Sequence, residues 1–132
     1  MKLRIVSLIL TLLPVPVFAE TVVYTDSQHP AVNLSPDSRV IMLDAPQQLQ
    51  QKIFGELPAD HVQSKAIAQQ IMQSAEWQQQ QQQLATAYSG VVHAWELGVS
   101  KVPAVVFDDR DVVYGTADVA QAATLRLQEG QP

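Results

Sequence analysis

Residues 98–115 constrain the fold more than any other part of the chain, because they read GVSKVPAVVFDDRDVVYG. Apolar runs at 104–108 and 112–114 are rich in β-branched residues, which favour strands. Pro103 cannot donate a hydrogen bond to a neighbouring strand, so it suits the first position of the first run. Asp109 and Arg110 form a polar turn between the runs. The segment therefore predicts a β-hairpin whose first strand is central, because both of its faces are apolar.

Two further strands are expected in the first third of the chain. Residues 21–25 read TVVYT, and residues 39–43 read RVIML, a continuous apolar run that favours a strand covered on both faces. Residues 26–38 between them hold prolines, aspartates, serines and an asparagine. This composition predicts a loop without room for a full helix.

Helical patterns fill the remaining segments. A short helix is expected at 46–54, after a helix-start signal at Asp44 and before a closing glycine. A long helical region opens near Asp60 and ends at Gly98, and a final helix follows a cap at Thr116. The order strand, strand, helices, strand, strand, helix predicts an α/β or α+β layer of helices against one small sheet.

The long helical region contains two features with structural consequences. One is an apolar stripe at spacings of four, three and four, formed by Leu84, Tyr88, Val91 and Trp95. The other is a run of six glutamines at 78–83, which we interpret as the solvated face of a helix because glutamine is a good helix former. Ser89 and Gly90 are the expected place for a kink or a division of the region.

The first nineteen residues have the pattern of a secretory signal peptide. Lys2 and Arg4 supply positive charge, residues 5–13 form a short apolar run, and Val17 and Ala19 are small residues before a cut. The alternative is a transmembrane anchor, which needs about 18 or more uninterrupted apolar residues. Two prolines interrupt this segment first. We therefore predict cleavage after Ala19, export, and no stable membrane insertion afterwards.

The predicted exported chain is one domain, residues 20–132, long enough to bury a core. Loss of Lys2 and Arg4 changes the formal net charge from −5 to −7. This acidic balance argues against nucleic-acid binding, which depends on Lys and Arg neutralising phosphate, and against adhesion to anionic lipid. The chain contains no cysteine, so it cannot carry disulfides, a lipid anchor on cysteine, or thiol chemistry.

Two segments resemble the thioredoxin-like superfamily. VVYTDSQHPAV at 22–32 resembles the first strand and active-site loop of glutaredoxin-type members, with His29 and Val32 where the cysteines would be and Pro30 on the motif's proline. Residues 98–115 resemble the family's loop and hairpin, which implies a cis-proline at Pro103. The implied fold is a small mixed sheet flanked by helices, with a shortened first helix and an extended central helical region.

The chain also resembles a family of small exported proteins encoded on integrating conjugative elements. The matching segments are YTDSQHP at 24–30 and KVPAVVFDDRDVVYG at 101–115. That family is similar in outline to periplasmic pilus-assembly proteins of the TrbC type. The resemblance implies a non-catalytic, periplasmic component of a conjugative type IV secretion apparatus, whose partners are other envelope proteins.

The residue types of several catalytic and metal sites are present without the required spacing. His29, His61 and His93 are isolated, whereas zinc sites usually show close pairs of ligands. Asp26, Ser27 and His29 are too close in one loop to align readily as a triad. The aspartates at 108, 109 and 111 lack the ligand number of a calcium loop, and a charged, solvated hairpin turn is the better interpretation. We therefore predict no catalytic residues, no metal and no cofactor.

A protein-binding surface is the functional prediction. In a thioredoxin-like fold the first loop lies beside the dipeptide before the hairpin, where related proteins bind extended peptides through backbone hydrogen bonds. The predicted partner-binding residues are Gln28, His29, Pro30, Lys101, Val102 and Pro103. A loop kept only for packing remains an alternative. Two other functions stay open: a cysteine-free exported enzyme using the His29 loop, and a periplasmic holdase chaperone that covers unfolded clients.

Overall fold

The structure is a computed structural model, and it describes residues 20–129. The predicted signal peptide at 1–19 and the last three residues of the predicted domain lie outside the described residues. The cut after Ala19 therefore stays a prediction.

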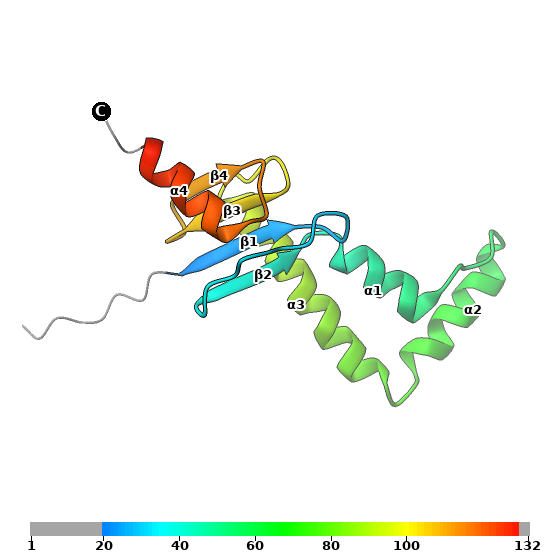
Figure 1. The fold of residues 1–132 in the computed structure, drawn as a ribbon. Helices are drawn as coiled ribbons and strands as arrows, with labels where there is room; N and C mark the ends of the chain where they lie inside the picture. Colours follow the sequence, from blue (N-terminus) through cyan, green and yellow to red (C-terminus); the bar gives the residue numbers. More distant parts are fainter. Residues whose placement is uncertain (1–19, 130–132) are drawn as a thin grey trace, which may run out of the picture.

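Four strands form one mixed sheet in the order β2-β1-β3-β4 (Figure 1). They are β1 (Thr21–Thr25), β2 (Ser38–Met42), β3 (Ala104–Phe107) and β4 (Asp111–Tyr114). β1 pairs with β2 in parallel, whereas β1 with β3 and β3 with β4 are antiparallel. The predicted strands are confirmed to within a residue at each end, and β3 is central and fully buried, as its two apolar faces predicted.

The connection from β1 to β2, residues 26–37, contains no helix. It crosses over in turns and bends, and it is anchored at Val32, which forms a bridge to Asp118 and accepts from the backbone N–H of Val119. A parallel connection normally needs about a dozen residues, and this loop supplies that length without regular structure. The expectation of a small mixed sheet with a reduced first helix is therefore confirmed, and the α/β class with it.

Four helices complete the described chain: α1 (Ala45–Phe54), α2 (His61–Met72), α3 (Trp77–Glu96) and α4 (Val119–Glu129). Gly55 ends α1 and Asp60 caps α2 by accepting two backbone N–H groups, as the sequence signals predicted. The end of α3 is a Schellman motif, because Gly98 and Val99 donate to the carbonyls of Trp95 and Ala94. Within residues 20–129, none of the helices combines the length and apolar character needed to span a membrane.

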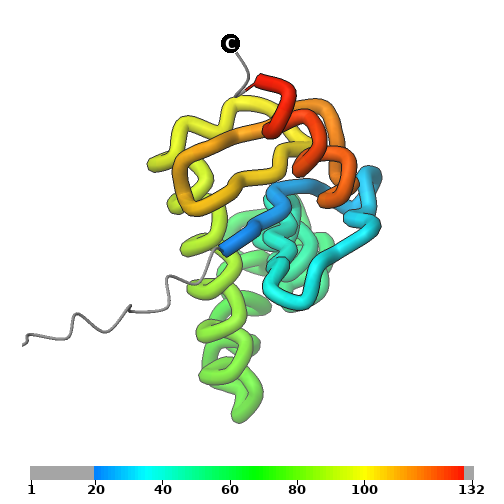
Figure 2. The backbone as a smooth tube through the Cα atoms, turned by 60° about the vertical axis from the view of Figure 1, so that its left-hand side comes forward, coloured from blue at the N-terminus to red at the C-terminus, as the bar shows by residue number. Residues whose placement is uncertain are grey.

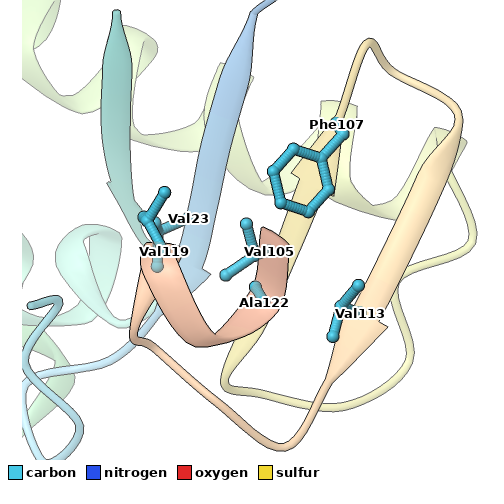
Figure 3. Close-up of a cluster of buried hydrophobic side chains, with 6 residues drawn as sticks. All are labelled: Val23, Val105, Phe107, Val113, Val119 and Ala122. Atoms are coloured by element: carbon cyan, nitrogen blue, oxygen red, sulfur yellow. The ribbon is translucent and has the colours of Figure 1, made fainter. Parts of the chain in front are cut away.

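The face of the sheet under α4 holds one hydrophobic cluster (Figure 3). Alternate residues of the strands point to opposite faces, so Val23, Val105 and Val113 share this side with the helix. Its six buried members are Val23, Val105, Phe107, Val113, Val119 and Ala122. Arg126 of α4 lies over the ring of Phe107, 4.7 Å from its centre, and covers the edge of the cluster.

The opposite face packs against the second half of α3. Val22, Tyr24 and Val106 meet Ala94 there, with Ile41 and Val112 beside them. Gly90 is required at this contact because a Cβ atom would lie 2.7 Å from Cγ2 of Ile41. Tyr24 is buried in this layer, and burial raises the pKa of its hydroxyl above the ordinary value. The sheet is thus covered on both sides, by one helix each.

Residues 45–84 form a helical arm that projects away from the sheet (Figure 2). In this described stretch, Pro46 is the only buried residue. An edge-on contact of Phe54 with Trp77, with ring centres 5.7 Å apart, joins α1 to the start of α3. The arm carries three of the chain's 13 acidic residues, so most of the negative charge lies on the sheet end.

Two sequence expectations are wrong, one about β2 and one about the long helical region. The run at 39–43 was expected to be covered on both faces, but β2 is an edge strand and Val40 is 37% exposed. The long helical region was expected to divide at Ser89–Gly90, but the helix continues there and the break lies at 73–76. Both differences arise because tertiary contacts, not local propensity, decide coverage and helix ends.

The predicted apolar stripe of α3 is divided between two environments. Leu84 and Val91 are partly buried, whereas Tyr88 is 45% and Trp95 is 77% exposed. The glutamine tract is helical, as expected, and its side chains are exposed except for that of Gln80, which is partly buried. The buried side of α3 is therefore narrower than the apolar stripe of the sequence.

Candidate functional site

The sheet register brings the two predicted binding segments to the same end of the sheet. β1 and β3 are antiparallel, and Tyr24 is paired with Ala104. The next step along the register sets Thr25 opposite Pro103. The loop that begins after Thr25 therefore starts where the segment before β3 ends (Figure 1). This juxtaposition is what the thioredoxin-like resemblance implied.

The first segment is shaped by one aspartate. Asp26 Oδ1 accepts the backbone N–H groups of Gln28 and His29, at 3.0 and 3.1 Å. The same oxygen lies 2.6 Å from Nδ1 of His29. Thr25, which is fully buried, donates its hydroxyl to the carbonyl of His29 at 2.6 Å. These bonds orient the His29 ring while leaving it about half exposed.

A second aspartate ties this loop to the start of α1. Asp44 Oδ2 accepts from the hydroxyl of Ser27 at 2.6 Å and from its backbone N–H at 3.1 Å. These hydrogen bonds to the charged form, led by the Ser27 hydroxyl, lower the pKa of Asp44 below the ordinary aspartate value. Nothing in the sequence pattern pointed to this contact, because Ser27 and Asp44 are 17 residues apart.

The Ser27–Asp44 contact gives a testable titration. A carboxyl with a lowered pKa stabilises the fold above its unfolded-state pKa, and this contribution is lost as the pH falls through the folded-state pKa. In Ser27→Ala we expect the pKa of Asp44 to rise towards the ordinary value, so less stability is lost in acid below about pH 4. Carboxyl NMR titration measures this. Ser64→Ala is the control, because its hydroxyl bonds a helix carbonyl. An unchanged Asp44 titration in Ser27→Ala would contradict the assignment.

The second segment is held by the end of the hairpin. The Val102–Pro103 peptide bond is cis, as the resemblance implied, and the Pro103 carbonyl accepts from the N–H of Gly115 at 3.0 Å. The Tyr114 hydroxyl donates to the carbonyl of Gly98 at 3.2 Å, which fixes the preceding loop. Lys101 and Val102 are exposed. Within residues 20–129, the backbone N–H and C=O of Val102 form no hydrogen bond with the rest of the chain.

The structure therefore places the six predicted binding residues at one end of the sheet, mostly on the surface. Gln28, His29 and Pro30 come from the loop after β1, and the other three come from the segment before β3. Val32 lies elsewhere, since its backbone is bonded to Ala117 and Val119 beside α4. The two positions aligned with the redox cysteines are thus held by different parts of the fold.

The residue sets weighed for catalysis and metal binding have other contacts. The Ser27 hydroxyl donates to Asp44 and not to His29, so the residues of the loop do not form a triad. His93 lies 3.3 Å from Asp109 and 3.5 Å from Glu96, linking α3 to the hairpin tip. Among the residues that the structure describes, no three His, Asp or Glu side chains are grouped to hold a metal ion.

The hairpin turn is charged and solvated, as expected, and two of its aspartates also bind α4. Asp111 is 2.7 Å from Arg126, and Asp108 is 3.2 Å from the same guanidinium group. The bonds from Arg126 and Arg110 lower the pKa of Asp111 below its usual range. This cluster joins the hairpin to α4 and is a structural contact that the local sequence did not predict.

The fold and the site define a cysteine-free α/β protein whose small mixed sheet presents an exposed loop and a cis-proline segment at one end. The chain belongs to the family described as "Protein of unknown function (DUF1525)", which it matches over residues 18–129. Neither the curated proteins nor the solved structures contain a match to it.

Proposed function

We propose that the protein is a non-catalytic, periplasmic component of a conjugative DNA-transfer apparatus that acts by binding other envelope proteins. The observation that carries the binding part is the unpaired backbone of Val102 next to Pro103 at the open end of the sheet. Free backbone N–H and C=O groups on the surface can pair with an extended peptide. Binding at this place needs no cysteine.

The surroundings of Val102 suit recognition without chemistry. His29 is oriented by Asp26 on one side, and Lys101 adds a positive charge to an otherwise acidic protein. A thiolate would be needed for disulfide exchange, and the chain has none. We propose that this is a thioredoxin-like framework in which the peptide-binding segment is retained without the redox pair.

The assignment to conjugation rests on the resemblance of two segments, YTDSQHP and KVPAVVFDDRDVVYG, to proteins of integrating conjugative elements. Export with cleavage after Ala19 belongs to the same proposal. The acidic balance supports partners that are proteins and not nucleic acid or anionic lipid. Genes for a conjugation ATPase, a relaxase or pilus proteins beside this one would support it, and an isolated metabolic operon would oppose it.

The test is a deletion of the gene in donor cells, followed by measurement of transfer frequency. We expect transfer to fall and to be restored by the natural chain, but not by the double variant His29→Ala, Lys101→Glu. Leu127→Ala is the control, because that side chain is 72% exposed on α4. Undiminished transfer after deletion would refute the role in conjugation. Full complementation by the double variant, with its envelope partners still co-purifying, would refute the binding surface.

One observation favours the alternative of an exported enzyme. His29 is paired with a carboxylate at 2.6 Å, which is the orientation that a general base requires. The surface hollows between the helices and beside α4 are lined by other residues, so this pair is not enclosed by them. A hydrolytic activity that is lost in His29→Ala and retained in the control variant Leu127→Ala would support the enzyme over the binding protein.

A further inference from the structure

Helix α3 carries an apolar stripe on its solvent side. Ala85 and Tyr88 are exposed in the middle of the helix. Val92 and Trp95 follow towards its C-terminal end, with 51% and 77% of their surface accessible. The spacings are three, four and three residues, so the four side chains lie on one face. That spacing is typical of the seam between two packed helices. Trp95 is the largest apolar group that the described surface exposes to this extent.

The side chains of the stripe match in size when the stripe faces a second copy of itself running in the opposite direction. Taken about position 90, Ala85 corresponds to Trp95, and Tyr88 corresponds to Val92. Two antiparallel copies of α3 would therefore set the smallest side chain of the stripe opposite the largest. Alternation of large and small side chains across facing positions is how helices interdigitate without voids.

We propose that α3 is the interface of a homodimer, in which a second copy of this chain packs antiparallel across a two-fold axis at the level of Gly90. Gly90 itself faces Ile41 of the sheet and not the partner. A two-fold interface uses the same patch on both subunits, which the reversed pattern of the stripe satisfies. This proposal is independent of the proposed role in conjugation.

Charge does not oppose this contact, although the whole chain is acidic. Among residues 77–96, the one Asp, Glu, Lys or Arg is Glu96 at the C-terminal end. In the antiparallel arrangement Glu96 comes opposite Leu84 of the second copy, so two like charges do not meet. Of the ten acidic residues outside the arm, Glu96 ends α3 and Asp109 of the hairpin contacts His93. The other eight lie on the sheet end and in the loops. Depletion of charge at the centre is the compositional feature of protein interfaces.

The size of the surface predicts a weak dimer. From their exposed fractions, Tyr88, Val92 and Trp95 offer roughly 300 Å² of apolar surface on each copy. A stable interface buries about 800 Å² per partner, so the flanking glutamine side chains must contribute the rest. Gln50 of α1 donates to the Tyr88 hydroxyl, so that ring is already held in place in the monomer. We expect a dimer that forms at tens of micromolar and dissociates at low concentration.

The experiment is sedimentation analysis of protein purified from cells that express the full chain, from about 1 to 100 µM. We expect the mass to rise from monomer to dimer. Trp95→Ala should weaken association about 30-fold, because buried tryptophans dominate interface energies. Ala85→Trp should also abolish it, by opposing two large side chains. The double swap Ala85→Trp, Trp95→Ala restores the large–small pairing and should restore the dimer.

Controls keep the result interpretable. Val62→Ala changes an equally exposed apolar residue on α2 and should leave association unchanged, and circular dichroism confirms that each variant is folded. In a Trp77→Phe background, emission from Trp95 should shift to shorter wavelength as the concentration rises. A monomer at all concentrations, or a dimer that survives Trp95→Ala, would overturn the proposal. A double swap that stays monomeric while Trp95→Ala also dissociates would overturn the antiparallel arrangement.

Discussion

Replacing Val105 by aspartate is expected to remove a large part of the chain's free energy of unfolding. Val105 lies at the centre of β3 with no exposed surface, between neighbouring strands and under α4. An isolated carboxylate there has no water and no partner, and such substitutions cost about 4 kcal/mol or more. Domains of this size are stable by about 5–15 kcal/mol in total, and the arm contributes little buried surface.

The matched control is the same substitution at Val40. Val40 and Val105 flank Val23 from opposite sides and share one face of the sheet, so chemistry and sheet position are comparable. Val40 is 37% exposed on the edge strand, so the carboxylate of an aspartate at this position remains hydrated. We expect Val40→Asp to cost about 1 kcal/mol and to retain a cooperative urea transition. Equal effects at the two positions would show that β2 is covered in solution.

The second large effect is expected at the contact of α3 with the sheet. A Cβ atom on Gly90 would lie 2.7 Å from Cγ2 of Ile41, and Ile41 is a stiff, β-branched residue on a strand. Gly90→Val must therefore push the helix from the sheet, at a cost of about 3 kcal/mol. Urea denaturation of the two proteins measures the difference.

Removing the opposing methyl group tests this cause directly. Ile41→Ala alone creates a gap and should destabilise the chain, but in combination with Gly90→Val the two losses should partly cancel. Ser89→Val is the control, because this neighbouring position in α3 is exposed and the change costs only a few tenths of a kcal/mol there. If the two losses simply add, the close approach of Gly90 to Ile41 is not the reason for the glycine.

Features coded by neighbouring residues could be predicted from the sequence. The hairpin at 98–115 is specified by proline, β-branched runs and a polar turn, all within eighteen residues. The glycine that ends α3 and the aspartate that begins α2 act within one helical turn. Such signals survive in any tertiary context, so the strands and most helix ends were correct.

Features that depend on distant contacts could not be predicted. β2 was expected to be covered on both faces because its residues are apolar, but how far a strand is covered is decided by the elements that pack on the sheet. The break at 73–76 contains no glycine or proline, and it coincides with the point where Trp77 meets Phe54. Tyr88 and Trp95 were expected to join Leu84 and Val91, but α3 contacts the sheet along a narrower face.

The sequence predicted the two segments of the candidate site, because each contains a short motif. The antiparallel pairing of Tyr24 with Ala104 then brings the two segments together in the fold. The Ser27–Asp44 contact and the anchoring of Val32 beside α4 join positions without any local signal. A single sequence holds no record of such pairs, which only the folded chain reveals.

The uneven placement of carboxylates between the arm and the sheet gives the molecule a permanent electrical polarity. Ten of the 13 acidic residues lie outside residues 45–84, and two of the lysines lie within them. Close to a negatively charged surface, such a molecule turns its acidic end outwards over distances of about one Debye length, near 8 Å at physiological salt. The glutamine-rich arm would then approach the surface first, and added salt would randomise the orientation of the molecule.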